Sequence, residues 1–75
     1  MFIKTNNDLI INAEHVFYFE ILKYLNVEKS SIKAYMDLIS PVIFTGTPEE
    51  TKQVFEELAT AISNKDMVLF DITKF

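Results

Sequence analysis

The stretch TPEETKQVFEELATAISN, residues 47–64, decides the fold because it carries a full set of helix-start signals and a helical repeat. Thr47 is a good N-cap, since its hydroxyl can accept a hydrogen bond from a free N–H group of the first turn. Pro48 suits the first helical position, and Glu50, three residues after the cap, completes a capping box. We therefore predict a helix over about 48–63.

The two sides of this predicted helix differ in chemistry. Its apolar residues recur at helical spacing and form one stripe, made of Val54, Phe55, Leu58, Ala59 and Ile62. The other side carries an acidic face, for which a solvated surface is the expected role: Glu49, Glu50, Glu56 and Glu57. Asn64 is expected to end the helix in a left-handed conformation.

Outward from the helix, the chain favours strands. β-branched and aromatic residues are concentrated in segments 2–5, 9–11, 15–25, 32–38, 42–45 and 67–73. Asn6-Asn7-Asp8 is typical of a turn, and Ser40-Pro41 interrupts strand pairing because proline cannot donate to a ladder. For residues 13–25 a helix capped by Asn12 remains the alternative.

These segments predict a single α+β domain over residues 1–75. We expect a small antiparallel β-meander of four to five strands, with the amphipathic helix packed on it and a C-terminal strand after the helix. Short connections between the predicted strands favour hairpin order.

Composition excludes several classes of partner. The formal net charge is −4 and the chain has no arginine, which disfavours nucleic acid because binding depends on neutralising phosphates. No apolar run is long enough for a membrane span, and the first residues lack the pattern of a signal peptide. Without cysteine neither a disulfide nor a thiolate zinc site can form, and a cytoplasmic location is expected.

The N-terminal residues Met1-Phe2-Ile3-Lys4-Thr5, a polar turn and then Leu9-Ile10-Ile11-Asn12 carry a family resemblance. Together with the T-x-E-E start of the helix, they resemble small uncharacterised proteins of Gram-positive bacteria and their phages. The resemblance implies a bacterial or phage origin, a cytoplasmic setting and a β-rich fold with one helix. It implies no activity. The chain departs from that pattern at Asp37-Leu38-Ile39-Ser40-Pro41, where such proteins often have an Asp-Gly turn.

No arrangement of residues indicates catalysis, a cofactor or a metal. His15 is the only histidine, and its neighbour Glu14 would point to the opposite face of a strand. A site made by His15 with Asp37 or Asp71 is conceivable, but a lone surface histidine is the favoured interpretation. The serines at 30, 31, 40 and 63 have only that histidine to activate them. We predict that the protein is not an enzyme.

The informative feature is an excess of apolar surface. One helix covers only one face of a small sheet, so the second face would expose aromatic side chains. The sheet could pair with another copy, bind a different protein, or curl into a barrel. Self-association as a homo-oligomer, with a dimer favoured, is the first expectation, through candidate interface residues Phe17, Tyr18, Phe19, Ile21 and Phe70. Phe19→Asp should then dissociate or unfold the protein.

The sequence thus predicts a cytoplasmic, acidic interaction module that engages proteins rather than transforming substrates. One alternative is a phage-type inhibitor that docks the acidic face on a basic surface of a host or defence protein. Another is a domain that binds a small ligand between sheet and helix, in a pocket lined by Tyr18, Tyr35 and Phe55.

Overall fold

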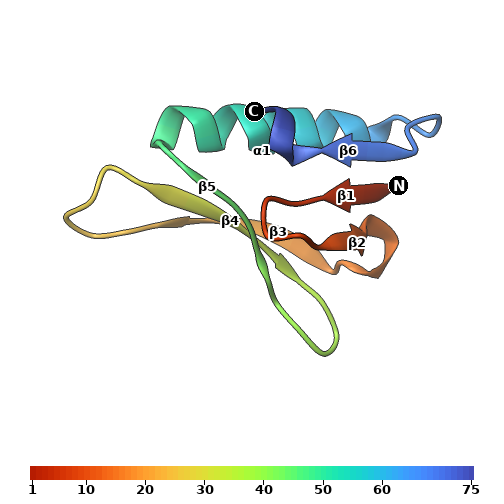
Figure 1. The fold of residues 1–75 in the computed structure, drawn as a ribbon, viewed down its shortest axis with the longest axis horizontal. Coiled ribbons are helices and arrows are strands. Elements are labelled where there is room, and N and C mark those ends of the chain that lie inside the picture. The colour runs from red at the N-terminus through yellow and green to blue at the C-terminus, as the bar shows by residue number, and fades with distance from the viewer.

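The computed structural model describes residues 1–75 and shows one helix packed with two three-stranded sheets (Figure 1). The elements follow in the order β1 Phe2–Lys4, β2 Ile10–Asn12, η1 Ala13–His15, β3 Tyr18–Lys23, β4 Ser30–Tyr35, β5 Val42–Gly46, α1 Pro48–Ser63, β6 Leu69–Asp71 and η2 Ile72–Lys74. The predicted α+β class is confirmed. The strands, however, form two sheets of three instead of one meander of four to five.

The larger sheet is an antiparallel meander in the order β3-β4-β5. Its register shifts between Ile32 and Lys33, which pair with Phe44 and Val42, so Ile43 is an extra residue in β5. Such a bulge turns two neighbouring side chains toward the same side. Ile43 and Phe44 are accordingly both buried.

The smaller sheet, in the order β2-β1-β6, joins the two ends of the chain. β1 pairs antiparallel with β2 across a turn in which Asp8 has φ 60°, and parallel with β6. Ile3 stands in register with Ile11 on one side and Phe70 on the other, and all three side chains are buried. This parallel pairing of β1 with β6 departs from the hairpin order that the sequence predicts, in which neighbouring strands are antiparallel.

The helix begins and ends where the sequence predicts. Thr47 Oγ1 accepts the Glu50 N–H, and Glu50 Oε1 accepts the Thr47 N–H at 2.9 Å, so the capping box is complete. The expected left-handed end is wrong: Asn64 has φ −92°, in the extended region. Its side-chain oxygen instead accepts the Asp66 N–H, which turns the chain without a positive φ.

Residues 13–25 contain both of the structures that the sequence left open. Asn12 does act as a cap, because its side chain accepts the Glu14 N–H, but it begins only the single turn η1. The strand then runs over Tyr18–Lys23, shorter than predicted. The predicted strands 32–38 and 67–73 are likewise shifted or shortened, to Ser30–Tyr35 and Leu69–Asp71.

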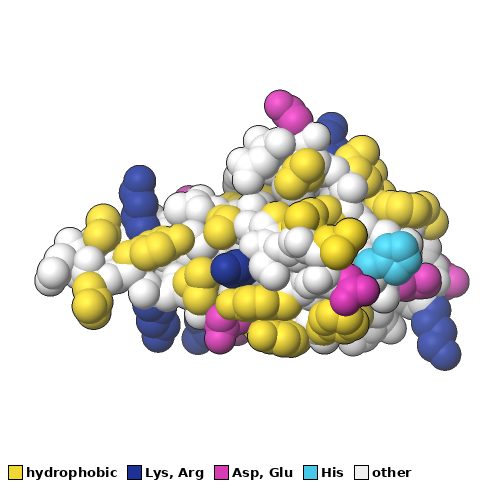
Figure 2. Space-filling view, turned by 90° about the horizontal axis from the view of Figure 1, so that it is seen from below, with side chains coloured by type: hydrophobic (Ala, Val, Ile, Leu, Met, Phe, Trp, Pro, Cys, Tyr) yellow, Lys and Arg dark blue, Asp and Glu magenta, His cyan; other side chains and the backbone are white.

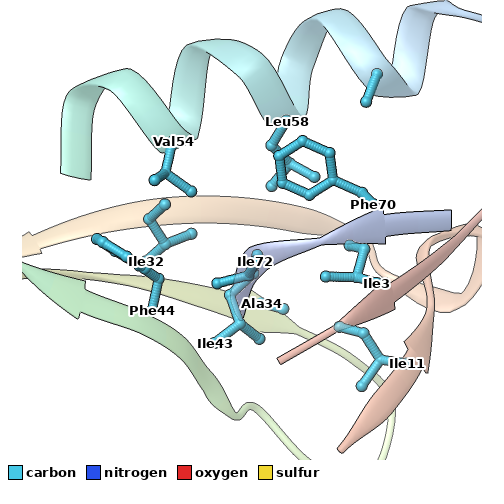
Figure 3. Packing of buried hydrophobic residues seen from close by; sticks show 11 residues of the cluster. Ile3, Ile11, Ile32, Ala34, Ile43, Phe44, Val54, Leu58, Phe70 and Ile72 are labelled. Carbon is cyan, nitrogen blue, oxygen red and sulfur yellow. The ribbon is translucent and has the colours of Figure 1, made fainter. Parts of the chain in front are cut away.

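One core holds the helix and both sheets together (Figure 3). The helix packs against β3, β4 and β5, and its side chains Val54 and Leu58 point toward the strands. The core is completed by Ile3, Ile11, Ile32, Ala34, Ile43, Phe44, Ala61, Phe70 and Ile72. α1 is too short and too polar to cross a bilayer, and it is the longest helix of the fold.

Candidate interaction surface

The helix leaves one face of the β3-β4-β5 sheet uncovered, and we call it the open face. Side chains alternate along each strand, so those that do not point toward α1 stand on this face. By register and contacts these are Tyr18, Glu20, Leu22, Tyr24, Ser31, Lys33, Tyr35, Val42 and Thr45. Figure 2 shows the molecule from the side away from the helix, with hydrophobic side chains spread along it and a lysine among them.

All three tyrosines of the chain stand on the open face. Tyr18 and Tyr35 face each other across β3 and β4 with their rings stacked, 4.3 Å between centroids. The Tyr35 hydroxyl donates to Glu20 Oε1 at 2.7 Å, and the Lys33 amine lies 5.2 Å from the centre of the Tyr35 ring. The rings are therefore held in place while Tyr18 stays 55% exposed.

This arrangement alters one titration. The hydrogen bond to the Glu20 carboxylate, with partial loss of solvent and the nearby negative charge, raises the pKa of Tyr35 to about 12. Ionisation of Tyr35 would place a second negative charge beside Glu20 and lose the hydrogen bond. Tyr35 therefore stays a neutral hydrogen-bond donor to a higher pH than an ordinary tyrosine.

A second group of hydroxyls fixes the far end of the open face. Ser31 Oγ lies 2.9 Å from the Tyr24 hydroxyl and 2.7 Å from Thr45 Oγ1, which links β3, β4 and β5. Ser31 itself is fully covered, whereas Tyr24 remains exposed over nearly half of its surface. A surface prepared in this way loses little side-chain freedom when a partner covers it.

The chain exposes more surface than its size requires. Its accessible surface is 5298 Å², whereas a folded monomer of 8.7 kDa exposes about 4,700 Å². The difference of about 600 Å² means that the chain is less compact than an average monomer of its mass. The molecule is also elongated, with a length of 38 Å and a thickness of only 20 Å.

The five residues predicted for the interface do not share one surface. Phe17 is 70% exposed and Tyr18 is on the open face. Phe19 and Ile21 point the other way and pack, half-buried, against the core. Phe70 is buried between β1 and the helix side of the core, so it belongs to the fold and not to a surface. Neighbouring side chains of β3 alternate between the two faces of the sheet, which separates Tyr18 from Phe19 and Ile21. Phe70 belongs to β6, in the other sheet, and points into the core.

The predicted acidic face is present on the outer side of α1. All four side chains are exposed: Glu49, Glu50, Glu56 and Glu57. The Glu50 carboxylate is engaged in the capping box, so it serves the helix start as well as the surface. The pocket expected between sheet and helix is absent, because Phe55 packs on the helix side of the sheet while Tyr18 and Tyr35 stand on the open face.

The other candidate residues are partly brought together. His15, Glu14 and Asp37 line one hollow of about 650 Å³ beyond the ends of β3 and β4. Asp71 lies elsewhere and accepts hydrogen bonds from Thr73, and the hydrogen bond from the Thr73 hydroxyl lowers the Asp71 pKa. No group of three or more His, Cys, Asp or Glu side chains is placed to hold a metal ion.

Comparison with protein-family models, curated proteins and solved structures finds no match for this chain. Its function must accordingly be argued from the chemistry of its own surface.

Proposed function

We propose that this chain is a non-enzymatic interaction module that forms a homodimer through the open face of β3-β4-β5. The observation that carries the proposal is the gathering of all three tyrosines on one face that no other element covers. Tyrosine is enriched in protein interfaces because its ring supplies contact area at a low cost in conformational entropy. Two of these tyrosines are already fixed by hydrogen bonds to Glu20 and Ser31.

Charge supports a second copy as the partner. The chain carries a net charge of −4, but the charged side chains of the open face are one acid, Glu20, and one base, Lys33. Two copies therefore meet through this face without net repulsion, while the acidic face of α1 points away on the other side. A single face that is neutral and carries both signs is self-complementary, as a twofold interface requires.

The strand register indicates how two copies would fit. Glu20 stands directly opposite Lys33, and Tyr18 directly opposite Tyr35. A twofold axis that runs between β3 and β4, along the strands, places each Glu20 over the Lys33 of the other copy. The same axis places Tyr18 over Tyr35, so aromatic surface meets aromatic surface at the usual spacing of about 10 Å between packed sheets.

The first test is the molar mass in solution by light scattering, at micromolar concentration and physiological salt. We expect twice the chain mass of 8.7 kDa, falling toward the monomer on dilution. One face of a small three-stranded sheet offers a contact at the lower end of specific interfaces, so the dimer should dissociate in an accessible concentration range. A monomer at all concentrations would contradict the proposal.

A charge exchange identifies the face. Glu20→Lys and Lys33→Glu should each be monomeric, because each places two like charges of one copy against two of the other. An equimolar mixture of the two variants should form a heterodimer, in which every Lys again faces a Glu. Matched controls on the outer side of α1, Glu56→Lys and Lys52→Glu, change the net charge equally and should stay dimeric. Dimers of either single variant alone would show that another surface is used.

The cellular setting belongs to the same proposal. A chain without cysteine gains nothing from an oxidising compartment, which favours the cytoplasm. An origin in Gram-positive bacteria or their phages stays a prediction of the N-terminal resemblance.

A further inference from the structure

The hollow beyond the ends of β3 and β4 combines apolar walls with acidic groups. It is lined by residues of η1 and of the loop between β4 and β5, with a volume of about 650 Å³. Phe17, Leu38 and Ile39 contribute apolar surface, and Leu38 is 96% exposed. Walls that stand this far into solvent do not enclose a small molecule, which normally has most of its surface buried.

Two acidic side chains line the hollow. These are Glu14 and Asp37; His15, the last residue of η1, also lines the hollow, and no lysine does. An apolar surface bordered by carboxylates fits a protrusion that presents apolar side chains together with lysine or arginine.

The same hairpin carries such a protrusion at its other end. The turn between β3 and β4 projects from one end of the molecule's long axis (Figure 1). It presents Leu25, 90% exposed, and Val27, also exposed. These stand between the exposed Lys23 and the exposed Lys29, with Glu28 as the one acid of the turn. We call residues 23–29 the basic tip.

The basic tip cannot reach the hollow of its own chain. The tip joins the end of β3 to the start of β4, whereas the hollow lies beside Phe17 and Met36, at the opposite ends of these strands. Six paired residues separate the two, a span of about 20 Å. A contact between them is therefore a contact between molecules.

We infer that the acidic hollow receives the basic tip of a second copy, so that copies associate head to tail. Leu25 and Val27 would cover Leu38, Ile39 and Phe17, with the tip lysines beside Glu14 and Asp37. Such a contact joins two different surfaces and does not close on itself, so it generates rings or open chains. The side chains that make this contact, among them Leu25 and Val27 of the tip, lie outside the open face, so the contact does not depend on the dimer proposed above.

Two variants, each of which lacks one of the two contacting surfaces, test this contact. A tip variant, Leu25→Ser with Lys23→Gln, keeps the hollow, and a hollow variant, Leu38→Ser with Asp37→Asn, keeps the tip. The charged residues are replaced by neutral ones, because reversed charges on the two disabled surfaces would attract each other. Both should carry Lys33→Glu, which removes the proposed open-face contact. The changed side chains of the tip and the hollow are exposed and Lys33 is half-buried, so folding should persist and is checked by circular dichroism.

Each variant alone should be monomeric, and their mixture should form a one-to-one complex with no larger species. The contact is small, so it is followed by amide NMR shifts of ¹⁵N-labelled tip variant titrated with hollow variant up to about 1 mM. Shifts confined to residues 14–17 and 36–39 are expected. No shifts, or equal shifts when the added protein also carries the tip substitutions, would overturn the inference. Neither result bears on the open-face dimer, which the charge exchange at Glu20 and Lys33 tests separately.

Discussion

Ser30 and Ser31 are neighbours in β4 and both are closed off from solvent, yet only Ser31 has a hydrogen-bond partner for its hydroxyl. Ser31 faces Tyr24 and Thr45 on the open face. Ser30 points toward the helix, where Thr51 bonds the Ser30 carbonyl oxygen and leaves the Ser30 hydroxyl unpaired. In β4, a serine whose hydroxyl is hydrogen-bonded thus stands next to a serine whose buried hydroxyl has no partner.

The two alanine substitutions should therefore act in opposite directions. Ser30→Ala removes an unpaired buried hydroxyl, whose burial costs about 1–3 kcal/mol, and should leave the free energy of unfolding unchanged or raise it by about 1 kcal/mol. Ser31→Ala leaves two hydroxyls without their partner and should lower it by about 1 kcal/mol. Urea unfolding of both variants at one protein concentration measures the difference. Equal destabilisation by the two would show that Ser30 makes an interaction of value.

Gly46, the only glycine, is required by the close approach of two side chains. A Cβ at this position would lie 2.9 Å from Glu50 Oε1 and 2.9 Å from the Phe44 ring. Gly46→Ala should displace the Glu50 carboxylate from the Thr47 N–H and lower the free energy of unfolding by about 1–2 kcal/mol. Combined with Glu50→Ala, the losses should be less than additive, because both variants lose the same capping bond. If the two losses of free energy add exactly, the destabilisation by Gly46→Ala comes from the clash with the Phe44 ring and not from the capping bond.

Adjacent residues of β3 should separate folding from association. Tyr18 stands on the open face and Phe19 packs against the core. Tyr18→Asp should yield a folded monomer, whereas Phe19→Asp places a charge beside the core and should lower the free energy of unfolding by about 2–3 kcal/mol. Light scattering and urea unfolding, applied to both, distinguish the outcomes. An unfolded Tyr18→Asp, or a stable Phe19→Asp, would contradict the assignment of faces.

The helix was predictable because its signals are local. The cap, the proline and the capping box lie within residues 47–50, and each acts within one turn. The predicted apolar stripe was right at Val54 and Leu58 and wrong at its far end, because Ala59 and Ile62 are exposed and Ala61 is buried instead. The prediction for Asn64 was wrong because it also used only local signals. An asparagine after a helix can adopt a left-handed conformation, or its side chain can accept a hydrogen bond from a nearby N–H, and the path of the chain toward β6 selects the second.

The division into two sheets was not predictable from local pattern. The pairing of β1 with β6 places Ile3 beside Phe70, which is nearly the whole chain away in sequence, and no local turn signal indicates this pairing. Alternation along β3 correctly placed Tyr18 and Phe19 on opposite faces, but which face the helix covers depends on packing. The hollow shared by His15 and Asp37 likewise arises where η1 meets the β4–β5 loop, far apart in sequence.

The raised pKa of Tyr35 gives a prediction for alkaline pH. The neutral phenol is the form that Glu20 stabilises, so its contribution to folding is full below the ordinary tyrosine pKa of 10.0 and is lost as pH rises to about 12. Glu20→Gln keeps an oxygen that can accept the hydroxyl proton but removes the carboxylate charge. The pKa of Tyr35 should therefore move down toward its ordinary value in this variant.

NMR of ¹³C-labelled tyrosine rings follows Tyr35 separately from the other two tyrosines, with the assignment fixed by Tyr35→Phe. The wild-type resonance should titrate at higher pH than the same resonance in Glu20→Gln. Glu56→Gln, on the outer side of α1, is the matched control and should leave the Tyr35 midpoint in place. Identical midpoints in the wild type and Glu20→Gln would mean that the 2.7 Å contact between Tyr35 and Glu20 does not persist in solution. The order on the open face, on which the proposed dimer depends, would then be lost as well.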